Sequence, residues 1–201
     1  MKALITGASS GIGLDMARYL AKQKYELILV GRDREKLEKV QESLPTKVTI
    51  IVADLANEQK VKELYVLTSK ENIDILINNA GFGDFGYFTE TDLSKELDMI
   101  NTNIKAVHIL TKSFLKDMEK KNSGYILNVA SSAAFQPGPL MATYYATKSY
   151  VYQLTEALYY EQKKKKQTFR KWCAREAINE LRKRIAEYAR KNNLKKLLTN
   201  N

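Results

Sequence analysis

Short apolar runs alternate with amphipathic helical patterns five times along the first 160 residues of this 201-residue chain. The runs that read as strands cover residues 2–6, 27–30, 48–52, 73–77 and 125–129. Because a helical pattern follows each run, the alternation predicts a parallel sheet with helices on both faces. We therefore expect an α/β fold over residues 1–160, a doubly wound sheet of about five strands.

The excess of positive charge lies entirely in the last part of the chain. Residues 1–160 contain 19 basic and 19 acidic side chains, whereas residues 161–201 contain 14 basic and 4 acidic ones. This composition boundary predicts a second region, a basic helical extension over residues 161–201. Clustered Lys and Arg can bind nucleic acid. Since no recognition motif accompanies them here, a solvated helix face is the favoured interpretation.

The bulk composition predicts a cytoplasmic protein. No apolar run approaches the ~20 residues that a membrane-spanning helix needs. The N-terminus lacks the apolar segment of a signal peptide. The single cysteine, Cys173, has no partner for an internal disulfide, which favours a reducing compartment.

A glycine cluster follows the first predicted strand directly and opens a helical pattern. At such a junction Gly7 permits a tight turn, Gly11 lets the backbone approach a pyrophosphate, and Gly13 lets the helix pack closely on the strand. The free N–H groups of the helix then face the phosphates. A glycine turn without a ligand is the alternative. The candidate cofactor-binding residues here are Gly7, Ser9, Ser10, Gly11, Ile12 and Gly13.

The ends of the later strands carry further candidates for a nucleotide site. Arg32 follows the second strand, where an arginine can pair with a 2′-phosphate, so NADP is favoured over NAD. The neighbouring Asp33 weakens this preference, because a carboxylate at this position can accept a hydrogen bond from a ribose hydroxyl. The alternative for Arg32 is a solvated charge in a loop. The third and fourth strands end in further candidate cofactor-binding residues, namely Asp54, Leu55, Asn79, Ala80 and Gly81. The alternative at the last three is a plain turn.

A serine, a tyrosine and a lysine follow the fifth predicted strand. Ser131 comes just after the strand, and Tyr144 and Lys148 lie one turn apart on one face of a helix. An ammonium beside a phenol favours the phenolate, which suits acid–base chemistry near neutral pH. Asn103 lies in the middle of a predicted helix, where asparagine is locally unfavourable. It either bonds a neighbouring element or kinks its own helix to bind water. His108, the only histidine, is interpreted as a structural residue, and no metal-ligand cluster is present.

These motifs together resemble the short-chain dehydrogenase/reductase family, with its NAD(P)-binding Rossmann fold, over about residues 1–160. The resemblance implies an oxidoreductase that moves a hydride between nicotinamide and a carbonyl or alcohol substrate of unknown identity. Tyr144 would be the general acid or base, Lys148 would favour its phenolate and bind the ribose, Ser131 would hydrogen-bond the substrate, and Asn103 would hold a water. Ser132 and Tyr145 are the competing serine and phenol. The family commonly forms dimers or tetramers, so a homodimer or tetramer is an expectation.

The chain departs from the family pattern after residue 160. No apolar β-branched run and no Pro-Gly turn follow, because the three prolines stand at positions 45, 137 and 139. The fifth strand is therefore expected to lie at an edge or to need a substitute cover. An apolar stripe in the extension, Ile178, Leu181, Ile185 and Tyr188, could cap that edge, pair with another subunit or be unrelated. A truncated, catalytically impaired family member that acts through association or through its basic tail is the alternative function.

Overall fold

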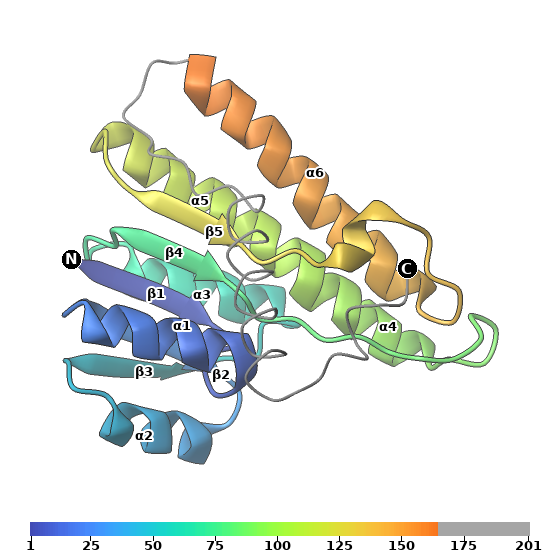
Figure 1. Ribbon diagram of the computed structural model, residues 1–201, viewed down its shortest axis with the longest axis horizontal. Coiled ribbons are helices and arrows are strands. Elements are labelled where there is room, and N and C mark those ends of the chain that lie inside the picture. The colour runs from blue at the N-terminus through green and yellow to red at the C-terminus, as the bar shows by residue number, and fades with distance from the viewer. Residues whose placement is uncertain (165–201) are drawn as a thin grey trace, which may run out of the picture.

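The computed structural model describes residues 1–164, which form one open sheet with helices on both faces (Figure 1). The strand order is β3-β2-β1-β4-β5, and every neighbouring pair is parallel. The strands are β1 (Lys2–Thr6), β2 (Glu26–Gly31), β3 (Val48–Val52), β4 (Ile75–Asn78) and β5 (Tyr125–Asn128). The predicted doubly wound α/β fold is confirmed for this part of the chain.

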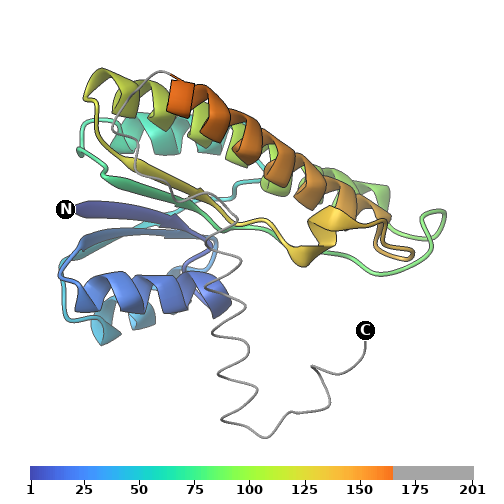
Figure 2. The ribbon, with the colours of Figure 1, turned by 45° about the horizontal axis from the view of Figure 1, so that its top comes forward.

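Helices cover the two faces of the sheet in separate groups, as Figure 2 shows. Helices α1 and α2 pack on one face, and α3, α5 and α6 lie on the other. The main helices are α1 (Gly11–Lys22), α2 (Arg34–Ser43), α3 (Glu58–Thr68), α4 (Leu93–Ile100), α5 (Val107–Lys120) and α6 (Ala142–Lys164). Two short segments complete the structure, a π-helical one over Asn101–Ala106 and a 3₁₀ turn over Ser132–Phe135.

Alternate residues of each strand supply the two halves of the core. On β1, Ile5 packs toward α1 and α2, while Leu4 packs toward α3 and α5. Both side chains are fully buried, as expected for a parallel sheet that is covered on each face. This double burial explains why the strands appear in the sequence as continuous apolar runs.

The strand order reverses between β1 and β4. The chain first moves outward from β1 to β2 and β3, and then returns to place β4 on the other side of β1. In open parallel sheets the crevice at such a reversal, beyond the carboxyl ends of the strands, is where ligands bind. The fold therefore places the glycine turn that follows β1 beside the Asn-rich turn that follows β4.

Most predicted boundaries agree with the structure within two residues. Polar N-caps set three helix starts, because the side chains of Asp33, Asn57 and Asp92 accept backbone N–H groups at the starts of α2, α3 and α4. Helical structure runs without a break from α4 to α5, and the segment Asn101–Ala106 between them is π-helical. The periodicity of the apolar side chains does not reveal the extra residue per turn.

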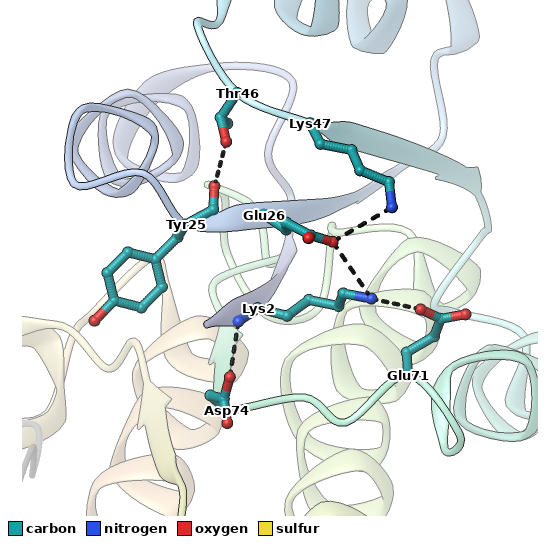
Figure 3. A network of polar contacts seen from close by, with 7 residues as sticks. All are labelled: Lys2, Tyr25, Glu26, Thr46, Lys47, Glu71 and Asp74. Atoms are coloured by element: carbon teal, nitrogen blue, oxygen red, sulfur yellow. Dashed lines mark hydrogen bonds and ion pairs between the residues drawn. The ribbon is translucent and has the colours of Figure 1, made fainter.

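Ion pairs connect the strands at the edge of the sheet where they begin, which is opposite their carboxyl ends (Figure 3). The Lys2 ammonium lies 2.6 Å from Glu71 and 3.6 Å from Glu26, and Lys47 lies 3.5 Å from Glu26. The backbone N–H of Lys2 also donates to Asp74 at 2.8 Å. The hydrogen bond and charge of Glu71 raise the pKa of Lys2, and Lys2 lowers the pKa of Glu71. This cluster joins the starts of the four strands β1 to β4, at the edge of the sheet opposite their carboxyl ends.

Strand β5 lies at one end of the sheet in the described part of the chain, as predicted for this strand. Helix α6 continues past the composition boundary at residue 160 and reaches Lys164. The rest of the predicted basic extension, with its apolar stripe, lies outside the described residues.

Candidate active site

A cleft of about 810 Å³ opens at the carboxyl edge of the sheet. Its walls come from the residues that follow all five strands and from the start of α6. The predicted cofactor and catalytic residues that line it are Gly7, Ser9, Ser10, Ile12, Arg32, Asp54, Leu55, Asn79, Ala80, Gly81, Tyr144 and Lys148. Gly11, Gly13, Asn103 and Ser131 are the predicted residues that do not line it. The fold thus brings together side chains that are up to 141 positions apart in the sequence.

The structure explains each of the three glycines of the first turn in a different way. Gly7 has a left-handed φ of 64°, and a Cβ there would lie 2.8 Å from the Cα of Ala80. A Cβ on Gly13 would lie 2.3 Å from the carbonyl oxygen of Gly7, so the close packing predicted for Gly13 is present. Gly11 also has a left-handed φ, of 54°, but a Cβ there would meet no atom within 4 Å. The backbone at Gly11 therefore faces open space at the N-terminus of α1.

Asn79 and Thr6 lock the glycine turn to the end of β4. The amide nitrogen of Asn79 donates to the carbonyl oxygens of Thr6 and Gly7 at 3.1 and 3.0 Å. In return, the Thr6 hydroxyl accepts the backbone N–H groups of Asn79 and Ala80, both at 3.0 Å. Thr6 was not among the predicted site residues. Its only sequence signal is a polar residue at the buried end of an apolar strand.

Arg32 and Asp54 lie at one end of the cleft and are both exposed. Among the described residues no carboxylate pairs with Arg32. The neighbouring Asp33 caps α2 instead, where it accepts the Lys36 N–H and pairs with the Lys36 ammonium at 2.8 Å. Those hydrogen bonds lower the pKa of Asp33. Asp54 accepts the N–H of Ala56 at 3.1 Å, which fixes the turn after β3.

Tyr144 and Lys148 lie at the other end of the cleft, on the first turns of α6. The Lys148 nitrogen is 5.9 Å from the centroid of the Tyr144 ring. It donates to the carbonyl oxygen of Val129 at 2.9 Å. Only 6% of Lys148 is exposed, and burial lowers the pKa of its ammonium to about 8. Lys148 is therefore a buried cation that loses its proton far more readily than an ordinary lysine.

Asn103 is buried behind the cleft and bonds a neighbouring loop and helix, one of the two predicted alternatives. Its amide nitrogen donates to the carbonyl oxygen of Phe82 at 2.9 Å and to the hydroxyl of Thr147 at 3.0 Å. Its amide oxygen accepts the N–H of Phe82 at 3.1 Å. A Cβ on Gly81 would lie 2.8 Å from that oxygen and 3.5 Å from the Lys148 nitrogen. The Asn103 oxygen and the Lys148 nitrogen therefore both border the space that a side chain at Gly81 would occupy.

Ser131 lies beyond the end of β5 and caps the 3₁₀ turn that follows. Its hydroxyl oxygen accepts the N–H of Ala133 at 3.2 Å, which leaves its hydrogen available for donation. The competing Ser132 is the first residue of that turn. The competing Tyr145 does not line the cleft, and its ring packs against Gly138, where a Cβ would lie 2.4 Å from the ring. Of the adjacent tyrosines, only Tyr144 faces the cleft.

The loop between β4 and α4 contributes to the wall beside Tyr144. Phe82, Gly83, Asp84 and Phe85 line the cleft. A Cβ on Gly83 would lie 3.1 Å from the Tyr144 ring. This close approach limits the movement of the ring.

His108 takes no part in the cleft. Its Nδ1 lies 2.6 Å from the hydroxyl of Tyr150, which links α5 to α6.

Within residues 1–164 no group of three or more His, Cys, Asp and Glu side chains could hold a metal ion. None of the helices in that stretch has the length and apolarity to cross a membrane.

A buried polar ladder, which the sequence did not predict, supports the sheet beneath the cleft. The amide nitrogen of Asn78 donates to Thr111 and to Asn128 at 3.1 and 2.8 Å. The amide nitrogen of Asn128 donates to Thr155 at 3.0 Å. These bonds tie β4 and β5 to α5 and α6, so they fix the helix that carries Tyr144.

Comparison with known proteins identifies the family. Residues 1–173 match the family described as short chain dehydrogenase, and the chain belongs to that family. It is similar to hydroxysteroid dehydrogenase-like protein 1 of Gallus gallus, with 37% identity over 166 residues. That match covers 79% of this chain and 50% of the relative, so this chain spans about half the length of that protein.

Solved structures agree with this assignment. The bulky-bulky ketone specific alcohol dehydrogenase from Comamonas testosteroni superposes with a TM-score of 0.77 at 31% identity, over 82% of this chain and 68% of that one. A metagenomic short-chain oxidoreductase in complex with NADP superposes with a TM-score of 0.76 at 29% identity. That match covers 82% of this chain and 77% of the other. The Rossmann-like fold is thus the fold of short-chain oxidoreductases.

Proposed function

We propose that this protein is an NADP(H)-dependent oxidoreductase that acts on a carbonyl or alcohol substrate, with Tyr144 as general acid and base. The observation that carries the proposal is the position of Tyr144 and the buried Lys148 in the same cleft as the glycine turn at Gly7. Family membership and the solved relative in complex with NADP support it.

The cleft fits a dinucleotide in size and in the chemistry of its lining. Its volume of about 810 Å³ lies within the roughly 300–1,000 Å³ of small-molecule and cofactor sites. The open space at Gly11, together with the N-terminus of α1, suits a pyrophosphate. Asp54 and Leu55 would lie against the adenine, and Asn79, Ala80 and Gly81 would form the floor. The reduced nicotinamide, when bound, supplies the hydride for the carbonyl carbon.

Tyr144 would donate its phenolic proton to the carbonyl oxygen in reduction and take it back in oxidation. Lys148, less than 6 Å from the ring centroid, would favour the phenolate by its charge and would bind ribose hydroxyls. Ser131 keeps a hydroxyl hydrogen to donate to the substrate oxygen. Asn103, held by Phe82 and Thr147, would position a water that connects Lys148 to solvent.

Arg32 supports the preference for NADP over NAD. It lines the cleft, and no carboxylate in the described residues neutralises it, while Asp33 is engaged with Lys36. A guanidinium in this state is suited to a 2′-phosphate, because the two can form paired hydrogen bonds. We further propose a cytoplasmic location and a homodimer or tetramer, as is common in the family.

Reduction of a ketone panel by Tyr144→Phe and wild-type protein tests the assignment. The variant should lose at least about 100-fold in kcat/KM, because general acid–base catalysis contributes roughly that much, while NADPH binding is retained. Tyr145→Phe is the matched control, since it removes the adjacent phenol, and it should keep its activity. Wild-type protein that reduces no ketone would favour the alternative, an impaired family member acting by association.

A further inference from the structure

A second, smaller cavity of about 130 Å³ adjoins the cleft on the side of Tyr144. Tyr144, Asp84 and Met141 line both spaces, so the cavity and the cleft adjoin at Tyr144. A backbone hydrogen bond of 2.9 Å from Gly86 to Leu140 joins the two loops that enclose the cavity. Helix α4 completes the wall with Glu96 and Met99. The cavity is thus positioned to hold the part of a substrate beyond its reacting carbon.

The charged side chains that line this cavity in the described part of the chain are both acidic. Among the described residues that line it, Asp84 and Glu96 are acidic, and none is Lys, Arg or His. The charge of Asp84 is balanced, because the Lys95 ammonium lies 2.6 Å away and its hydrogen bond lowers the pKa of Asp84. Glu96 is different: it is 92% buried, being only 8% exposed, and no cation in the described part of the chain pairs with it.

Within the described residues the Glu96 carboxyl group accepts one hydrogen bond, from the Thr91 hydroxyl at 2.8 Å. A carboxylate has about four acceptor sites, and burying its charge is costly unless a cation or further donors complete its shell. Glu96 therefore provides unused acceptor capacity in a cavity that ends at the catalytic phenol.

We propose that Glu96 determines substrate specificity by binding an ammonium or hydroxyl group of the substrate in this cavity. The substrate class is then a small amino- or hydroxy-substituted ketone, or the corresponding alcohol. The cavity volume sets the size, since an apolar cavity on the order of 150 Å³ holds a benzene ring. Anionic substrates such as 2-keto acids are disfavoured because none of the described residues that line the cavity is cationic. The inference rests on the proposed function, because it assigns Tyr144 to the reacting carbonyl.

A binding experiment tests the cavity without turnover. The full-length protein is titrated with 1-amino-2-propanol and with 2-butanol, which have equal numbers of heavy atoms, and binding is followed by ligand-observed NMR. Wild-type protein should bind the amine at least about tenfold more tightly, as hydrogen bonds to charged groups allow. Equal affinity in wild-type protein would overturn the proposal, and this comparison needs no variant.

Two variants then assign the preference to a residue. Glu96→Gln should remove the preference for the amine, whereas Asp98→Asn, an exposed acidic residue on the same helix, should keep it. The proposal would be overturned if the preference for the amine survived in Glu96→Gln or disappeared equally in Asp98→Asn. Either result would assign the preference to the electrostatic field of the whole protein.

Turnover with NADPH separates this inference from the proposed function. We expect kcat/KM to fall in the order aminoacetone, hydroxyacetone, 2-butanone and pyruvate, and Glu96→Gln to reduce the first value selectively. Reduction of 2-butanone at least as fast as aminoacetone would overturn the specificity and leave the activity standing. Amine binding through Glu96 without any turnover would support this inference and contradict the proposed function.

Discussion

Lys148 makes the folded protein less stable at neutral pH than it would be with an uncharged side chain at this position. Burial lowers its pKa from the ordinary value of 10.5 to about 8. Because each pKa unit corresponds to about 1.4 kcal/mol, holding the ammonium in the fold costs about 3 kcal/mol below pH 8. Between the two pKa values the unfolded state binds more protons, so stability rises with pH and the cost is progressively removed.

Lys148→Met replaces the ammonium by an apolar chain of similar length and should therefore be more stable than wild type at neutral pH. The lost hydrogen bond to Val129 offsets about 1 kcal/mol of the gain, but this offset hardly changes with pH. Between about pH 7 and about pH 10 the unfolding free energy of wild type should therefore rise by about 2.5 kcal/mol relative to that of Lys148→Met.

Urea unfolding of both proteins at the two pH values measures this shift. Lys112→Met, which removes an exposed lysine from α5, controls for the general loss of one charge and should show a much smaller dependence. A stability difference for Lys148→Met that is the same at both pH values would refute the argument that burial depresses this pKa.

Three further predictions concern the framework of the site. Gly13→Ala should lower the free energy of unfolding by more than about 2 kcal/mol, because its Cβ would lie 2.3 Å from the backbone oxygen of Gly7; a change below about 0.5 kcal/mol in urea unfolding would contradict the close packing. Asn128→Leu should cost about 2–3 kcal/mol by leaving buried partners of the polar ladder unpaired, and thermal unfolding at an unchanged midpoint would contradict this. Glu71→Gln should be less stable than wild type at pH 7. Since Lys2 lowers the pKa of Glu71, this gap should close as the pH falls through that pKa, and a gap that persists in strong acid would be inconsistent with the ion pair.

The parallel sheet was predictable because its strands are buried on both sides. Leu4 and Ile5 point to opposite faces and both are fully buried, which leaves a continuous apolar run in the sequence. The boundary of β4 was less certain, since Ile73 continues the apolar run but lies in the core before the strand begins at Ile75. Local patterns predict where apolar residues gather and do not fix where pairing starts.

The end of the cleft around Gly7, Arg32, Asp54 and Asn79 was also predictable, because these residues come just after strands. The partners that hold the end beside Tyr144 together could not be named from the sequence. Asn103 lies in the π-helical segment, and its partners Phe82 and Thr147 are 21 and 44 positions away. Thr6 likewise depends on the tertiary fold, because its partners Asn79 and Ala80 are 73 and 74 positions away.

Binding of NADPH to the full-length protein, measured by isothermal titration calorimetry beside NADH, tests the central claim most directly. The account predicts saturable binding of NADPH that is at least about tenfold tighter than that of NADH, since Arg32 can pair with the additional phosphate. Arg32→Ala should remove the difference, while Arg34→Ala, whose guanidinium pairs with Glu38 at 3.7 Å, should keep it. The absence of saturable binding by either nucleotide would contradict the assignment of the cleft as a nicotinamide nucleotide site.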